Sequence, residues 1–302
     1  MKNLFILMLS CLFIFVACAN GSSSSEAKND KEDNNSSVET IVPRTEVNGK
    51  IGKFESPYEV GDIVFNDGSA IPYSTELTLT AEQKSAAIAI IFYKGKGLNN
   101  GNDTATNRTL GVGLKHDRYV AWCQESVAAE DKEITTIECE FSGNKGNYIF
   151  TDSTANRRNG SNNLELIGEF LSTIDGVTDD TTGDGAATRY PAFYFAKNYK
   201  NTATNLKGTS YETGWYLPSF AELYQIYYCS KNSQNAVDVD VVSELCNGDK
   251  FGYEWYLSST QHKVRSAWDE YLVSVFSFED DSWKGCFKKN PIYCVCAIRE
   301  FN

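Results

Sequence analysis

Hydrophobic and polar residues divide the beginning of the chain into two stretches. Lys2 supplies a positive start, and Leu4 to Val16 is an almost unbroken apolar run. Because this run is shorter than the roughly 20 apolar residues of a membrane span, and ends at a small residue before a cysteine, it predicts an export signal over residues 1–17. Residues 18–57 are mostly Ser, Asn, Asp, Glu and Lys. Such a stretch buries too little apolar surface to fold, so we expect a disordered tether.

From Tyr58 onward the pattern changes to short apolar segments separated by turn residues. The β-branched segment that ends at Asp67-Gly68 predicts a hairpin, since this dipeptide favours tight turns. Ala86 to Tyr93 is continuously apolar, which is typical of a strand covered on both faces. Further short strands are expected at 110–114, 119–123, 255–260, 268–278 and 292–298.

Two segments have helical patterns. Apolar residues recur at three- and four-residue spacing from Asn163 to Ile174, which predicts an amphipathic helix. Ser219 and Glu222 form an S-x-x-E capping box at the start of a second apolar stripe. Strands and helices do not alternate regularly, so we predict an α+β fold with two helices packed on short, mostly antiparallel strands with long loops.

Charge and length restrict the class of protein. The net charge of −12 argues against binding to nucleic acid or to an anionic membrane surface. No second apolar run is long enough to span a bilayer. The region 58–302 is long enough for one large domain.

The segment Phe15-Val16-Ala17-Cys18 resembles the lipobox of bacterial lipoproteins. This resemblance implies that Cys18 is lipidated after removal of the signal, and that the protein is anchored in the bacterial cell envelope, at the outer membrane and exposed at the surface. The alternative is an ordinary signal that releases a soluble protein. The polar tether favours the anchor, because a released protein has no evident need of a spacer.

Seven cysteines remain after Cys11 leaves with the signal and Cys18 carries the lipid. An odd number in an exported chain leaves at least one thiol unpaired if the others form disulfides, and the sequence leaves the connectivity open. Pairing between neighbours along the chain would close short loops. These pairs would be Cys123 with Cys139, Cys229 with Cys246, and Cys286 with Cys294.

Metal binding has weak support. No C-x-x-C motif occurs, and the two histidines, His116 and His262, are far apart in the sequence. The acidic loop from Asp175 to Tyr190 offers oxygen ligands for calcium, although it lacks the bidentate Glu of an EF-hand. Solvated turns are the commoner explanation for such a loop. We therefore predict no cofactor and keep calcium as an open alternative.

An ordered set of residues near the C-terminus resembles bacterial domains with a C-type-lectin-like fold. Such domains include the C-terminal domain of Legionella collagen-like proteins, the Fibrobacter succinogenes major paralogous domain, and Treponema surface lipoproteins. The matching residues are Gly214, Trp215, Leu217, Pro218, Glu222, Leu223, Trp255, Ser258, Ser259, Ala267, Trp268, Lys289, Asn290, Val295, Ile298 and Arg299. The resemblance implies a C-type-lectin-like fold of the formylglycine-generating-enzyme type over 58–302, with a ligand-binding part at about 213–302.

Within this group the resemblance implies a binding protein, in some members diversified by a retroelement, and not an enzyme. Its partner would be a host or neighbouring-cell protein or glycan. Aromatic and charged residues in the C-terminal loops are typical of a recognition surface, although they are also typical of ordinary solvated loops. The candidate ligand-binding residues are Gln261, His262, Lys263, Arg265, Asp269, Glu279, Asp281, Trp283 and Phe287.

Two other functions are open alternatives. A structural envelope lipoprotein would need no discrete ligand. A formylglycine-generating oxidase would need a pair of cysteines four residues apart, whereas Cys286 and Cys294 are more widely separated. The motif pairs that calcium-dependent lectins use for sugars are also absent from the sequence. The fold name therefore carries no sugar specificity.

Overall fold

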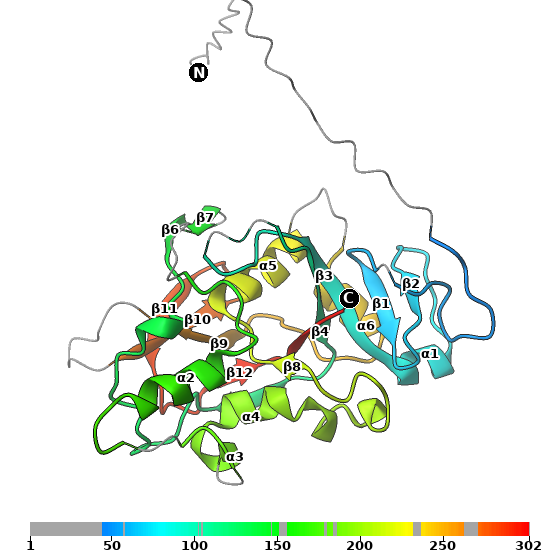
Figure 1. The fold of residues 1–302 in the computed structure, drawn as a ribbon. Coiled ribbons are helices and arrows are strands. Elements are labelled where there is room, and N and C mark those ends of the chain that lie inside the picture. Colours follow the sequence, from blue (N-terminus) through cyan, green and yellow to red (C-terminus); the bar gives the residue numbers. More distant parts are fainter. Residues whose placement is uncertain are drawn as a thin grey trace, which may run out of the picture. The chain divides into compact units, whose positions relative to one another are not determined.

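The continuous apolar run of the sequence forms β3 (Ala87–Gly95), which lies inside a six-stranded sheet of order β2-β1-β3-β4-β13-β8 (Figure 1). All neighbouring strands in this sheet are antiparallel. The predicted hairpin is confirmed, since Asp67-Gly68 lies in the turn between its first two strands. The other strands are β1 (Asp62–Phe65), β2 (Ala70–Pro72), β4 (Arg108–Gly113), β8 (Trp215–Tyr216) and β13 (Ile298–Glu300).

A computed structural model describes residues 44–301 of the chain with a few gaps. The gaps are residues 57, 102, 104, 146, 151–155, 178–179, 184–185, 232–236 and 263–270.

A second, five-stranded sheet has the order β11-β10-β9-β12-β5. Only β12 and β9 pair in parallel; the other neighbours are antiparallel. A separate hairpin is formed by β6 and β7. The bounds are β5 (Asp117–Val120), β6 (Phe141–Asn144), β7 (Asn147–Phe150), β9 (Trp255–Gln261), β10 (Leu272–Ser277), β11 (Trp283–Phe287) and β12 (Tyr293–Val295).

Both predicted helices are present, as α2 (Asn163–Ser172) and α5 (Phe220–Lys231). Shorter helices that the sequence pattern did not predict connect the strands. They are α1 (Ala81–Ala86), α3 (Ala186–Arg189), α4 (Pro191–Lys197), α6 (Val239–Leu245) and the 3-10 turns η1 (Thr135–Ile137), η2 (Tyr199–Asn201) and η3 (Thr204–Leu206). The fold is therefore a mixed α+β fold with mostly antiparallel strands.

The six-stranded sheet is buried on both faces, which explains why β3 is continuously apolar from Ala87 to Phe92. Ala89 and Ile91 belong to one core cluster, whereas Ile90 and Phe92 belong to the other. Successive side chains of a strand point to opposite faces, so each face has its own core. The first cluster includes side chains of α2, α4 and η2, and the second includes side chains of α5 and α6.

The folded unit begins before Tyr58, where the sequence pattern placed the end of the tether. Arg44 forms an ion pair with Asp62 at 2.8 Å, and its guanidinium lies 4.5 Å from the centre of the Phe54 ring. The backbone of Phe54 exchanges hydrogen bonds with Ala70 at the end of the sheet. Residues 44–56 therefore contact the domain. The sequence missed this because their polar composition resembles that of the preceding segment.

The cysteine pairs suggested by sequence spacing are not formed. All seven cysteines in the described chain are buried free thiols. Cys286 lies on β11 and Cys294 on β12, with two strands between them, so the strand spacing separates them by roughly 14 Å. A disulfide needs Cα atoms within about 7 Å. Cys123 and Cys139 belong to different core clusters. Among the described helices, none is long and apolar enough to cross a bilayer.

Candidate ligand-binding site

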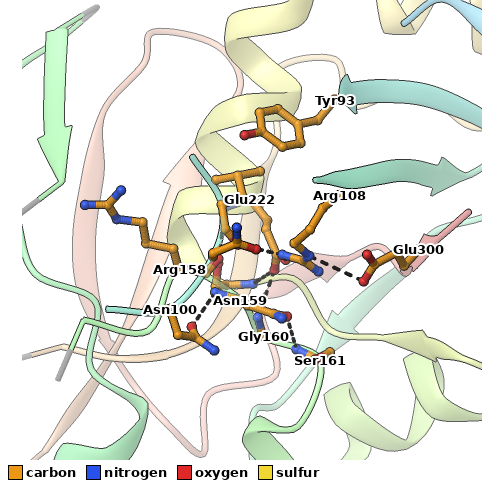
Figure 2. A network of polar contacts seen from close by, with 12 residues as sticks. Tyr93, Asn100, Arg108, Arg158, Asn159, Gly160, Ser161, Glu222 and Glu300 are labelled. Carbon is orange, nitrogen blue, oxygen red and sulfur yellow. Dashed lines mark hydrogen bonds and ion pairs between the residues drawn. The ribbon is translucent and has the colours of Figure 1, made fainter. Parts of the chain in front are cut away.

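The L-P-S-x-x-E segment folds around the carboxylate of Glu222 (Figure 2). The predicted capping box is confirmed, because Ser219 donates its backbone N–H to Oε2 of Glu222 at 2.8 Å and accepts from the Glu222 N–H with its hydroxyl. The backbone N–H of Gly160 also donates to Oε2, at 3.1 Å. A Cβ at Gly160 would lie 2.8 Å from the carbonyl oxygen of Leu217, so glycine permits this approach.

The other carboxylate oxygen of Glu222 accepts from two side chains. Arg108 donates to Oε1 at 3.0 Å and the hydroxyl of Tyr216 at 2.9 Å. Arg108 also donates to the carbonyl oxygen of Leu98 at 2.6 Å and to Glu300 at 3.4 Å. Burial disfavours the charged guanidinium, but Glu222, Tyr216 and Glu300 together outweigh this effect and raise the pKa of Arg108. Because the carboxylate accepts four hydrogen bonds, its role is structural.

A cleft of about 570 Å³ lies beside this network. Its wall includes Trp215 and Leu217 from the same motif, together with Glu300. The indole N–H of Trp215 donates to the carbonyl oxygen of Tyr211 at 2.7 Å, and Lys197 at the rim pairs with Glu165. These polar groups are already satisfied by protein partners. The other charged side chains of the lining are also paired, Lys200 with Glu212 and Glu300 with Arg108.

Two of the predicted ligand-binding residues contact each other, Trp283 on the edge strand β11 and His262 directly after β9. The ring of His262 lies 4.9 Å from that of Trp283, at 84°. Gly285 makes room for this contact, since a Cβ there would lie 2.5 Å from Cδ2 of His262. Burial lowers the pKa of His262, so its ring is neutral at pH 7. Phe287 is partly exposed, and the alternation of side chains along β11 gives it the same face as Trp283.

Gln261 does not lie on the predicted recognition surface. Its side chain is 1% exposed, and Oε1 accepts from the backbone N–H of Ile134 and from Nζ of Lys288, both at 3.0 Å. The sequence interpretation was wrong about this residue because Gln261 is the last residue of β9 and points into the protein.

The turn between β10 and β11 holds two more predicted residues with different surroundings. Glu279 is exposed, whereas Asp281 is buried and has a left-handed φ of 57°. The hydroxyl of Tyr148 donates to the carbonyl oxygen of Asp281 at 2.8 Å, and Lys145 pairs with Asp280. The β6–β7 hairpin therefore holds this turn in place.

The remaining predicted residues lie outside the described residues. They are Lys263, Arg265, Asp269 and the lipidation candidate Cys18.

Lys284 directly follows Trp283 on β11 and was not among the residues predicted from the sequence. Lys284 is exposed, and its Nζ lies 4.1 Å from the centre of the Trp255 ring. This ammonium therefore interacts with an aromatic ring at the edge of the five-stranded sheet. The W-K-G-C-F sequence, with Lys284 between an aromatic residue and a glycine, could have indicated this exposed lysine.

In the described part of the loop that was proposed to bind calcium, oxygen atoms of Asp180 accept hydrogen bonds from protein groups. The carboxylate of Asp180 accepts from the hydroxyl of Tyr190 at 2.5 Å, and its carbonyl oxygen accepts from Arg189. No group of three or more His, Cys, Asp or Glu residues in the described chain could hold a metal ion. Burial raises the pKa of Cys286 to about 12 and that of Cys294 to about 11, so neither thiol is activated.

Comparison with known proteins supports the fold class. No family model and no curated protein sequence matches the chain. A solved structure of a fimbrial protein from Bacteroides ovatus is similar, with a TM-score of 0.50 at 15% identity. The similarity covers 81% of this chain and 49% of the fimbrial protein, so the chain spans about half the length of that protein. At this identity the likeness concerns the fold alone.

Proposed function

We propose that the chain is a surface-displayed, ligand-binding lipoprotein of the adhesin type. Its domain would have a C-type-lectin-like fold of the formylglycine-generating-enzyme type, and its C-terminal loops would bind a host or neighbouring-cell protein or glycan. The pairing of His262 with Trp283 over Gly285 carries this proposal. The neutral imidazole of His262 and the indole of Trp283 on the edge strand β11 offer contact area and hydrogen bonding without the cost of desolvating a charge.

Three further observations are compatible with this function. Phe287 is a partly exposed aromatic side chain at the end of β11, and Glu279 is an exposed charged side chain in the turn before this strand. Lys263, Arg265 and Asp269 closely follow His262 in the sequence. The structural neighbour named above is a fimbrial protein.

The membrane anchor is part of the proposal. Lipidation of Cys18 would hold the domain at the outer membrane, and residues 19–43 would supply the spacer. The sequence resembles Treponema variable protein A, in which a retroelement diversifies the C-terminal region. The same mechanism here would change side chains around His262 and leave the Glu222 network intact.

Binding of the full chain to an array of host matrix proteins and glycans tests this proposal. We expect at least one hit, and we expect Phe287→Ser to weaken it tenfold or more. Val241→Ser is the matched control, since Val241 is also an exposed apolar side chain but lies on α6. The absence of any hit, or equal binding by the two variants, would contradict the proposed site and favour a structural envelope protein.

A further inference from the structure

A cleft of about 670 Å³ lies between the start of β5 and the loop at 248–254. None of the ligand-binding residues predicted from the sequence lines it. Its aromatic wall is formed by His116 and Phe251, whose rings lie 4.6 Å apart. Nδ1 of His116 shares a hydrogen bond of 2.7 Å with the hydroxyl of Tyr256. This wall is therefore aromatic, and it is held in place by Phe251 and Tyr256 of the second core cluster.

The loop that forms the other side of this cleft is anchored at several points. The carboxylate of Asp240 accepts the backbone N–H groups of Phe251 and Gly252, at 2.6 and 2.9 Å. The carboxylate of Asp249 accepts the backbone N–H of His116 at 2.9 Å. These bonds connect the loop to α6 and to β5, so the cleft is formed before any ligand arrives.

A β-bulge in β5 turns Tyr119 outward beside this cleft. Tyr293 pairs with Val120 and Val295 with Asp117, so two residues, Arg118 and Tyr119, face one residue of β12. Tyr119 has a left-handed φ of 61° and a side chain that is 75% exposed. A side chain with a Cβ is strained in this conformation, and glycine would relieve the strain. A tyrosine kept at a strained bulge, with its ring in solvent, indicates a role in recognition.

A second exposed tyrosine lies on the loop that lines the cleft, whereas Tyr119 itself directly follows the lining residue Arg118. Tyr253 lines the cleft and is 79% exposed, the most exposed of the large hydrophobic side chains in the described chain. Arg118, which precedes Tyr119, pairs with Glu254, which follows Tyr253, at 2.6 Å. This ion pair connects β5, which carries Tyr119, to the loop that carries Tyr253.

The polar groups of the cleft are of mixed charge. Its lining contains Asp117, Arg118, Asp249, Lys250 and Glu254. Three carboxylates beside two cations that are both already paired, Arg118 with Glu254 and Lys250 with Glu244, disfavour a polyanion such as a sulfated or phosphorylated chain. Exposed aromatic faces beside groups that both donate and accept hydrogen bonds match a pyranose ring, which has an apolar C–H face and a rim of hydroxyls.

We propose that this cleft binds the pyranose rings of an uncharged glycan, with Tyr119 and Tyr253 as stacking faces. The volume of about 670 Å³ is in the range of small-molecule sites. This site is separate from the one on β11, because β5 and β11 are the opposite edge strands of the five-stranded sheet.

The test is binding of the full chain, solubilised in detergent, to an array of neutral hexasaccharides built from glucose, mannose or N-acetylglucosamine, with heparin as the charged comparison. We expect binding to at least one neutral glycan. Tyr119→Gly and Tyr253→Gly should each weaken it tenfold or more, whereas Tyr119→Phe should retain it. Tyr119→Gly also relieves the backbone strain, so its melting temperature should stay within about 5 °C of the parent. A loss of binding in this variant is therefore not a loss of folding.

Several outcomes would overturn this proposal. They are no neutral-glycan binding by the parent, binding unchanged in Tyr119→Gly, and tyrosine-dependent binding to heparin or to protein alone. Val241→Ser, at an exposed side chain of α6 outside both sites, is expected to leave glycan binding at this cleft unchanged. Equal loss in Phe287→Ser and Tyr119→Gly would contradict a separate site.

Discussion

Arg108 and Glu222 form an ion pair at 3.0 Å although they are 114 residues apart in the sequence. The side chain of Arg108 is 2% exposed and that of Glu222 is not exposed at all. The pair joins β4 to the first turn of α5, and Glu222 further accepts the backbone of Gly160. It therefore fixes three distant segments around one carboxylate.

Removing one charge of this pair should destabilise the fold strongly. Glu222→Gln leaves the buried Arg108 with only the more distant and partly exposed Glu300 as a counter-charge, and we expect a loss of about 3–5 kcal/mol in the free energy of unfolding. Chemical denaturation followed by circular dichroism measures this. Glu165→Gln is the control, because the pair of Glu165 with Lys197 is exposed and contributes about 1 kcal/mol or less. An equally small effect in both variants would refute the structural role of Glu222.

Protonation of His116 should destabilise the fold in mild acid. Burial lowers the pKa of His116 to about 4, from an ordinary value of 6.5. The folded state therefore favours the neutral ring, and this contribution is complete above pH 6.5 and is lost as the pH falls toward 4. Unfolding measured from pH 7 to pH 4 should show a smaller loss of stability in His116→Phe than in the parent. Parallel curves for the two proteins would rule out this assignment.

A methyl group at position 285 should displace His262 from Trp283. In Gly285→Ala the new Cβ meets Cδ2 of His262 at 2.5 Å and Cδ1 of Leu272 at 2.6 Å, so both side chains must move, at a cost of about 1–3 kcal/mol. Thermal unfolding and near-UV circular dichroism of the tryptophans report the two effects. The double variant with His262→Ala should recover part of the lost stability, and no recovery would show that the clash lies elsewhere.

Lys288 should contribute more to stability at alkaline pH. Its ammonium is 2% exposed and donates to the carbonyl oxygens of Ala129 and Lys132, at 2.7 and 2.9 Å, besides Gln261. Burial lowers its pKa from 10.5 to about 8. Between these values the unfolded chain binds more protons than the folded one, so stability rises with pH.

The matched variant for this prediction is Lys288→Met. It should be less stable than the parent by about 1–3 kcal/mol at pH 7, because the buried acceptors lose their donor. The gap should widen between pH 8 and pH 10, as measured by chemical denaturation at both values. A gap that narrows over this range would contradict the assigned pKa direction.

Local patterns predicted the elements that depend on local chemistry. The capping box at Ser219 and the apolar run of β3 were visible in the sequence because each rule acts within a few residues. The burial of Gln261 was not predictable, since it depends on Ile134 and Lys288 from distant segments. The bulge that exposes Tyr119 depends on the register of β5 with β12, which no local pattern encodes.

The candidate site was predictable only in part. His262 and Trp283 were selected for their chemistry, but their contact requires Gly285, whose missing side chain carries no such signal. Spacing along the chain was also a poor guide for cysteines, because Cys286 and Cys294 lie on strands separated by two others.

The most direct test of the central proposal is the dissociation constant of the full chain for its array hit, compared between the parent, Phe287→Ser and Val241→Ser. We predict a rise of tenfold or more, equivalent to about 1.4 kcal/mol or more, for Phe287→Ser and no change for Val241→Ser. Equal dissociation constants for all three proteins would contradict ligand binding at the edge strand β11.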